Sequence, residues 1–279
     1  MHEVKDRWFG TIAWGVALAV ACTFGWMVFD LLRHGLGQVT WSFLTEAPRD
    51  AGRAGGIGPV LVSTLWILGV CLGVVLPVGV GCAAWLSEFV PTDQALGRWV
   101  RRSLDLLAAV PSIVFGLFGA IFFCQSLGLG FSILSGGLTL SCMVLPILIR
   151  ATEAGFRSAP DELRLGAAAL GMTRTATIRH LLLPAALPGI VVGLVLGIGR
   201  ALAETAALIF TSGYVARMPS SWLDSGRSLS VHIYDLAMNV PGGEEKAYAT
   251  ALVLIVLLVG INVTASWAAE TWLGGKWAR

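Results

Sequence analysis

Apolar residues in this sequence gather into blocks that are each long enough to cross a lipid bilayer. About 20 apolar residues in a helix span the roughly 30 Å of hydrocarbon. We expect six such helices, at 8–32, 59–86, 104–127, 131–149, 184–211 and 247–272. The composition supports this, because only 13% of the residues are charged, whereas a soluble domain carries about 25%. The sequence therefore predicts an all-α, polytopic membrane protein with about six transmembrane helices.

The first block follows Lys5 and Arg7, as the apolar part of a signal peptide would. It is longer than the roughly 7–15 residues of such a part, and no small-x-small cleavage site closes it, so we expect a retained helix. Lys and Arg favour the cytoplasmic side of a membrane protein. With the N-terminus inside, the inner segments hold twelve of them and the outer segments six. The sequence therefore predicts that both termini are cytoplasmic.

Two outer segments, 33–58 and 212–246, are long enough to fold locally. The second contains an amphipathic stretch, Leu229–Met238, for which an interfacial helix and a re-entrant segment both stay open. Proline interrupts several apolar blocks, at Pro77, Pro111, Pro146 and Pro188. Each proline removes a backbone hydrogen bond. These breaks fit ordinary kinks, and they also fit a pathway in which a wet cavity satisfies the freed backbone groups.

The charges, cysteines and histidines argue against nucleic-acid binding, metal binding and catalysis. A net charge of +2 is too small to indicate a nucleic-acid partner. The five cysteines lie in apolar blocks without a CxxC pair, so neither a metal site nor a disulfide framework is expected. The four histidines are scattered, and no catalytic Ser/His/Asp set is evident. No GxxxxGK[ST] sequence is present, so the chain should neither bind nor hydrolyse ATP by itself.

The longest inner connection, residues 151–183, predicts two helices joined by a glycine turn. Ser158-x-x-Asp161 is a helix-start pattern, and good helix formers follow it as far as residue 170. Gly171 fits a left-handed C-terminal cap. Thr173 then caps a second short helix that ends near Pro184. From the residues alone, a plain surface loop and a docking element for a cytoplasmic protein both stay open.

Two charged residues, Arg200 and Glu204, lie inside the fifth block. Arg200 is 16 residues past the proline that opens this block, about 24 Å along a helix axis. At that depth a charge that faces lipid costs at least about 2.5 kcal/mol. Both charges share one arc of the helix with a close-packing stripe, Gly189-x3-Gly193-x3-Gly197, so they should face the protein interior. Either they brace the helix as an ion pair, or they line a substrate path, where guanidinium suits an oxyanion.

Residues 163–184 resemble the EAA loop of ABC-importer permeases, in which EAA is followed by three residues, Gly, nine residues and Ile-x-Leu-Pro. Gly171 and Pro184 stand at the matching intervals. Counting back from Gly171 places Leu165 at the Glu position, so the acidic residue of the family is absent here. In the family this loop enters a cleft on the ATP-hydrolysing subunit. The residues expected to contact the ATPase are Leu165, Gly166, Ala167, Gly171, Arg174, Leu181 and Pro184.

Four separated stretches resemble the phosphate branch of these permeases, PstA and PstC, and the ending of the last one, Thr-Ala-x-Leu-x-Phe, favours PstA. They are GGIGP at 55–59, the segment 77–88 ending in WLSE, LAAVPSIVFGLFG at 107–119 and GRALAETAALIF at 199–210. The last matches a segment with a membrane-embedded Arg and Glu, which implies a substrate-path role for Arg200 and Glu204. We expect Thr205 and Ser112 to contribute to the same path. For Ser112 a simple cap at a helix break is an equal alternative.

The resemblance implies the MetI-like permease fold and a role in importing inorganic phosphate across the bacterial inner membrane by alternating access. Residues 1–53 would form an N-terminal transmembrane helix and a periplasmic connection, and residues 54–279 the permease core with its coupling loop at 151–183. The implied partners are two ATPase subunits, a second permease of the PstC type, an extracytoplasmic phosphate-binding protein and membrane lipid. No cofactor would be bound by this chain, because ATP and Mg²⁺ belong to the partner ATPase.

Two alternatives stay open. The chain could serve another oxyanion, such as tungstate, molybdate or phosphonate. It could also be a membrane sensor or scaffold that docks a cytoplasmic protein through residues 151–183 without moving solute.

Overall fold

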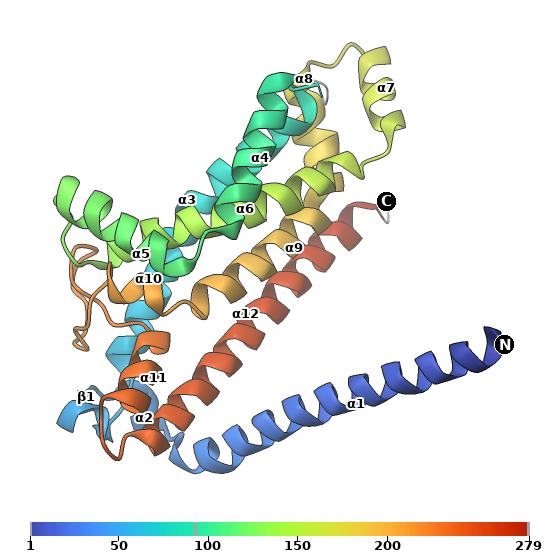
Figure 1. Ribbon diagram of the computed structural model, residues 1–279. Helices are drawn as coiled ribbons and strands as arrows, with labels where there is room; N and C mark the ends of the chain where they lie inside the picture. Colours follow the sequence, from blue (N-terminus) through green and yellow to red (C-terminus); the bar gives the residue numbers. More distant parts are fainter. Residues whose placement is uncertain (1, 92–93, 278–279) are drawn as a thin grey trace.

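Long helices run between two ends of the molecule (Figure 1) in a computed structural model that describes residues 2–91 and 94–277. They are α1 (His2–Gly35), α3 (Gly58–Glu88), α6 (Ile133–Arg157), α9 (Leu183–Leu202) and α12 (Glu244–Trp277). Five helical spans are long and apolar enough to cross a membrane, and a bent pair makes a sixth. The prediction of an all-α protein with about six spans is confirmed.

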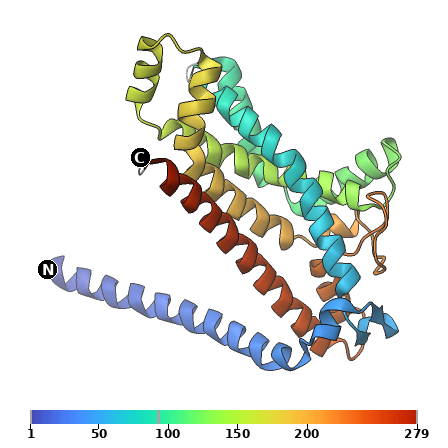
Figure 2. The same ribbon diagram turned by 180° about the vertical axis from the view of Figure 1, so that it is seen from behind.

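Short elements close the two ends of the bundle. At one end lie η1 (Leu36–Gln38), α2 (Trp41–Thr45), the strands β1 (Pro48–Arg49) and β2 (Ala54–Gly55) with η2 (Asp50–Gly52) between them, and α11 (Leu229–Met238). At the other end lie α7 (Asp161–Ala169) and α8 (Arg174–Thr177). Both chain ends lie away from the end that carries α2 and α11 (Figures 1 and 2). We call the first the outer end and the second the inner end.

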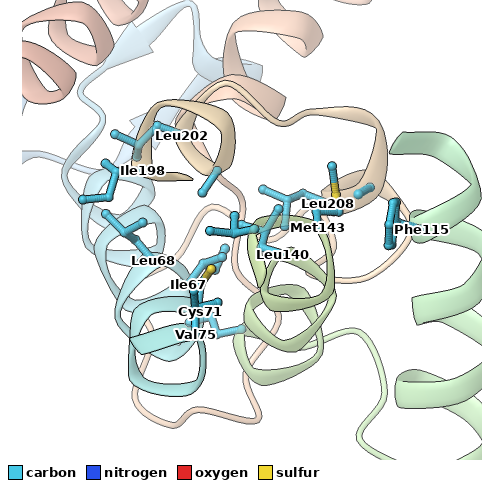
Figure 3. Packing of buried hydrophobic residues seen from close by; sticks show 14 of the residues in the cluster. Ile67, Leu68, Cys71, Val75, Phe115, Leu140, Met143, Ile198, Leu202 and Leu208 are labelled. Atoms are coloured by element: carbon cyan, nitrogen blue, oxygen red, sulfur yellow. The ribbon is translucent and has the colours of Figure 1, made fainter. Parts of the chain in front are cut away.

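Apolar side chains from α3, α6 and α9 form the central core (Figure 3). Two shorter helices, α5 (Ser112–Gly119) and α10 (Ala206–Ile209), add to it from the side. The labelled members are Ile67, Leu68, Cys71, Val75, Phe115, Leu140, Met143, Ile198, Leu202 and Leu208. The helix breaks described below are therefore anchored on this core, whereas the inner loop packs on a second cluster that includes Leu86, Phe156 and Leu182.

The predicted glycine stripe of the fifth block is the contact between α9 and α6. A Cβ atom added to Gly189 would lie 2.6 Å from the Cα of Gly155 and 2.7 Å from the carbonyl oxygen of Ala151. One turn further along α9, Gly193 approaches Leu148, and Gly197 then approaches Val144. Only residues without a side chain permit two backbones to come this close.

The third block is not the straight helix expected at 104–127. It consists of α4 (Ala95–Ala109) and α5, continued by a π-helical segment (Ala120–Ser126), and the two halves meet at 99°. The break falls at Val110 and Pro111, where Val110 is extended with ψ of 131°. Proline forces its predecessor out of the helical region, which explains why the helix cannot pass through this point.

The fifth block also differs from the expectation of 184–211. The second loop helix does not end near Pro184, because α8 continues through a π-helical segment (Ile178–Leu182) into α9. The wider π turn lies where the ring of Pro184 would otherwise meet the preceding carbonyl groups. One continuous helix thus runs from Arg174 to Leu202. It ends before Glu204, which we expected inside it.

Helix α1 diverges from the rest of the molecule (Figures 1 and 2). None of its apolar window is buried. Near its C-terminal end, the Tyr248 hydroxyl on α12 donates to Asp30 at 3.1 Å, and the rings of His34 and Tyr248 lie 5.0 Å apart. The helix is therefore attached to the bundle at the outer end.

At the outer end, α11 is packed into the molecule, and it is not a helix lying free on the surface. The Ser230 hydroxyl donates to the carbonyl oxygen of Glu204 at 2.6 Å, and the Leu229 N–H donates to Thr64 on α3 at 2.9 Å. His232 is fully buried beside Gly52 of the short outer hairpin. This hairpin pairs Pro48 with Gly55 and Arg49 with Ala54, so it spans the expected boundary between residues 53 and 54.

The Gly155–Gly189 contact predicts a steric penalty for any side chain on α9 at that point. Gly189→Ala should lower the free energy of unfolding by about 1–3 kcal/mol, because backbone atoms cannot move aside as a flexible side chain would. Thermal unfolding of the purified protein in detergent measures this. Gly199→Ala is the matched control, since an added Cβ there meets nothing within 4 Å. Equal melting temperatures for both variants would contradict the packing.

The buried His232 predicts a loss of stability in mild acid. Burial, and secondly the charge of Arg227, lower the pKa of His232 to about 4, against an opposing effect of Asp235. The unfolded chain binds this proton near pH 6.5. Stability should therefore fall by on the order of 3 kcal/mol as the pH drops from 6.5 to 4, and below that this residue should contribute no further loss.

Unfolding measured from pH 8 to 4 tests this for the wild type and for His232→Gln. The substitution should flatten the pH dependence, whereas His180→Gln, on the exposed inner loop, should leave it unchanged. An unaltered profile in His232→Gln would refute the assignment.

Candidate functional site

The first candidate region is the break between α9 and α10. Glu204 lies in this break, and its carboxylate Oε1 accepts the N–H of Ala207 at 3.2 Å. Its backbone carbonyl accepts the Ser230 hydroxyl from α11. The side chain is almost fully buried. Glu204 therefore caps α10 and joins the membrane-embedded segment to the outer end.

Arg200 stands in the last turn of α9 and differs from Glu204 in exposure. Its side chain is 48% exposed, and its Nη2 lies 3.9 Å from Glu204 Oε2. The expectation that both charges face the interior is correct for Glu204 and wrong for Arg200 within this chain. Arg200 is about 60° around the helix from Gly197, so it lies beside the face that packs on α6 and remains open.

The depth of Arg200 follows from the pairing of α9 with α6. The two helices are antiparallel, and Gly197 approaches Val144. Three residues further on, Arg200 is level with about residues 140–141 of α6. The α6 segment 133–149 carries no charged side chain. Arg200 is therefore level with the middle of an apolar segment, as the sequence predicted.

The second interruption, between α4 and α5, lies close to the first. Gly116 of α5 faces α10, where an added Cβ would lie 2.9 Å from the Cα of Ala207. Ser112 opens α5, and Thr205 precedes α10. Both residues are half-buried, and neither hydroxyl has a hydrogen-bond partner within residues 2–91 and 94–277. The two breaks thus bring open hydroxyl groups to neighbouring segments, and Arg200 lies one turn before the second break.

The inner loop confirms the predicted glycine turn. Gly171 has φ of +68°, its N–H donates to the Ala168 carbonyl, and the Met172 N–H donates to the Ala167 carbonyl, both at 3.0 Å. This is the left-handed cap that ends a helix at a glycine. The Thr173 hydroxyl accepts the Ala176 N–H at 3.3 Å and caps α8, as expected.

The predicted helix start at Ser158 is wrong. The Ser158 hydroxyl donates to the carbonyl of Gly155 at 2.9 Å, at the end of α6. Helix α6 extends to Arg157, so Ser158 closes that helix, and α7 begins only at Asp161 after Pro160. The longer α6 uses the serine that the pattern had assigned to α7.

The residues expected to contact the ATPase fall into two groups. Leu165 is 70% exposed, and Gly166, Gly171 and Arg174 are exposed as well. By contrast, Ala167 is only 2% exposed, and Leu181 and Pro184 are half-buried in the continuous helix. Leu170, which the pattern did not single out, is 81% exposed. The outward surface of this loop therefore carries two exposed leucines beside charged residues such as Glu162 and Arg174.

Arg164, which the sequence did not single out, binds the loop to the bundle. Its Nε and Nη2 donate to the two carboxylate oxygens of Glu88, at 3.2 and 2.8 Å. Nη2 also donates to the Phe156 carbonyl at 2.9 Å, and Nη1 to the Ala159 carbonyl at 3.0 Å. Glu88 and Arg164 are 76 residues apart, and no local pattern links them.

A second group of charges joins α4 to α6 near the inner end. The buried carboxylate of Glu153 accepts from Arg101 of α4 at 2.7 Å and from Arg157 of α6 at 3.0 Å. Arg150 approaches it at 3.5 Å and donates to Asp105 of α4. The spacing of 150, 153 and 157 is that of neighbours on one helix face, a signal that could have found the part within α6 if the expected helix had been extended beyond residue 149. The described residues hold no group of three or more His, Cys, Asp and Glu placed for a metal ion.

Comparison with known proteins identifies the family. Residues 75–270 match the model of the binding-protein-dependent transport system inner membrane component. The chain is 29% identical to the probable ABC transporter permease protein YqgI of Bacillus subtilis, over 93% of this chain and 92% of that protein. It is 32% identical to the phosphate transport system permease protein PstA 1 of Mycobacterium tuberculosis, over 86% and 81% of the two chains.

Solved structures share the fold. A bacterial alginate ABC transporter, in complex with its pentasaccharide-bound periplasmic protein, superposes with a TM-score of 0.66 at 16% identity, covering 93% of this chain and 95% of that one. The MetNI methionine ABC transporter gives 0.54 at 19% identity, covering 79% and 94%. Since the family model covers more than half of the sequence, this chain belongs to the inner-membrane permease components of binding-protein-dependent ABC importers.

Proposed function

We propose that this permease imports inorganic phosphate. A binding-protein-dependent permease works with an ATPase and a binding protein. If the substrate is phosphate, the expected partners are two ATPase subunits, a second permease of the PstC type and an extracytoplasmic phosphate-binding protein. The PstA proteins at about 30% identity support the substrate class.

The observation that carries the proposal is the open guanidinium of Arg200 at mid-membrane depth. Lipid contact at this depth is costly for an arginine. The open face of Arg200 is therefore covered by another protein surface or by a water-filled path. Guanidinium presents planar paired donors that match two oxygens of phosphate at once. We assign this face to the path between the two permease subunits.

The neighbouring groups have distinct roles in this proposal. Glu204 is held by α10 and α11, so it is a fixed negative charge 3.9 Å from Arg200. It weakens the hold of Arg200 on an anion, which then passes through. The open hydroxyls of Ser112 and Thr205 donate to the same anion, and interrupted helices of this kind line midplane sites in other transporters.

The inner end is proposed as the cytoplasmic end, with both termini on that side. The exposed loop around α7 then meets the ATPase, and the outer end around α2 and α11 faces the binding protein. Leu165 and Leu170 replace the acidic contact of the EAA pattern, so docking in this permease is mainly apolar.

Replacing the Arg200 guanidinium should abolish transport while the transporter complex stays assembled. Arg200→Gln is expected to reduce ATP-dependent entry of labelled phosphate into proteoliposomes at least tenfold, and Arg200→Lys to retain part of it, because lysine lacks the paired donors. Leu18→Ala, on α1 away from the proposed path and also exposed, is the control and should transport normally. Wild-type rates in Arg200→Gln would remove the proposed role.

Competition by tungstate, molybdate and phosphonate in the same assay separates phosphate from other oxyanions. An intact complex that hydrolyses ATP but moves none of these solutes would favour a sensor or scaffold.

An apolar docking surface predicts that a new charge on it prevents assembly. Leu165→Glu and Leu170→Glu should each reduce recovery of the ATPase with the tagged permease at least fivefold after mild detergent extraction. Arg179→Ala, an exposed arginine of the same region, should not. Undiminished recovery in Leu165→Glu would show that the partner accepts the acidic residue of the family. Ala167 is unsuitable for this test because its side chain packs inside.

A further inference from the structure

The inner loop is attached to the bundle by one polar side chain that reaches three helices. Arg164 lies on α7, its partner Glu88 is the last residue of α3, and the Phe156 carbonyl belongs to the last turn of α6. The Arg164 side chain is 28% exposed and that of Glu88 is 12% exposed. The contact is thus largely withdrawn from water, on a face of α7 about 100° around the helix from the exposed Leu165.

The geometry of this contact resists relative movement. The guanidinium meets both carboxylate oxygens of Glu88 in a fork, and it also donates to main-chain carbonyls and to Asp161 Oδ1 on its own helix. Charge-assisted forks of this kind are stronger and more directional than neutral hydrogen bonds. Breaking one partner of a largely buried pair leaves a charge without compensation. A displacement of α7 is therefore carried to the ends of α3 and α6.

Besides this contact, α7 is attached to those helices mainly by the apolar packing of Leu163 and the buried Ala167. The chain leaves α6 through Ser158–Pro160 and reaches α8 through the turn at Gly171. A cavity of about 290 Å³ lies between α7, α8 and the end of α3, lined by Glu88, Arg164, Ala168, Met172, Arg174 and Leu182 among others. It gives α7 room to shift toward α8 when Arg164 no longer holds it.

We propose that Arg164, paired with Glu88, is the positioning residue that transmits movement of the docking loop to α3 and α6. The inference rests on the proposed function in one respect, since it takes the loop as the contact with the ATPase. The continuous helix from α8 to α9 carries the same movement toward Arg200, and the Arg164 contact makes α3 and α6 move with it. The pair thereby links nucleotide-driven closure to opening of the pathway.

The test compares transport with ATP hydrolysis in the assembled importer, reconstituted with its ATPase and binding protein. Arg164→Ala and Glu88→Gln should keep basal ATP hydrolysis within about twofold of the wild type. The phosphate imported per ATP hydrolysed should fall at least tenfold. Arg164→Lys, which keeps the charge and loses the paired donors, should recover part of this ratio. Arg179→Ala is the matched control and should keep the wild-type ratio.

A second readout does not depend on the transported solute. In the wild type and in Arg179→Ala, ATP binding should change amide hydrogen exchange at the inner end of α3, residues 80–88. In Glu88→Gln and Arg164→Ala this response should be lost. If the wild type moves no phosphate but still shows the response, the substrate assignment fails and the coupling role stands.

Two results would overturn the inference. One is a wild-type transport ratio in Glu88→Gln, a residue that lies on α3 away from the exposed leucines. The other is an unchanged nucleotide response in both variants. If Arg164→Ala fails to assemble with the ATPase, Glu88→Gln alone decides between these outcomes.

Discussion

The close contact between α6 and α9 determines where charge can lie in this permease. Gly189 and Gly155 allow the two backbones to touch, and the register continues through Gly193 and Gly197. Because that register is fixed, Arg200 lies level with the uncharged middle of α6. The depth of Arg200 therefore follows from backbone packing. Its position in the sequence determines only on which face of α9 it lies. A slip of this contact would carry the guanidinium toward another depth or onto another side of the bundle.

Two helix interruptions place polar and charged groups in the region around Arg200. Pro111 turns the chain by 99° between α4 and α5, and α9 ends at Leu202. The broken ends meet on the central core, where Glu204 uses its carboxylate to cap α10 and so becomes a fixed charge. At the inner end the helix from Arg174 to Leu202 runs without a break from the docking loop to Arg200. Movement of the loop and the setting of the guanidinium are thus connected through a single rigid element.

Residue patterns predicted local features well and three-dimensional pairing poorly. Apolar blocks located the spans, the Gly171 cap followed from helix-end chemistry, and the glycine stripe of α9 was correctly read as a packing face. The patterns failed where a neighbouring element changed the outcome. Ser158 served the end of α6 instead of α7, and a π turn carried the helix past Pro184. The Arg164–Glu88 contact joins residues 76 positions apart, so only the fold reveals it. Helical periodicity placed Arg200 only on the same broad arc of the helix as the glycine stripe. That is too coarse to distinguish a buried side chain from an exposed one.

Water access to position 200 tests the central claim most directly. In the assembled importer, with the native cysteines replaced, Arg200→Cys should react with a membrane-impermeant, positively charged thiol reagent in at least one nucleotide state. Leu18→Cys, on α1, which diverges from the bundle, provides the comparison for an exposed position away from the proposed path. A cysteine at 200 that no aqueous reagent reaches in any nucleotide state would contradict the account, because the guanidinium would then be sealed away from any passing anion.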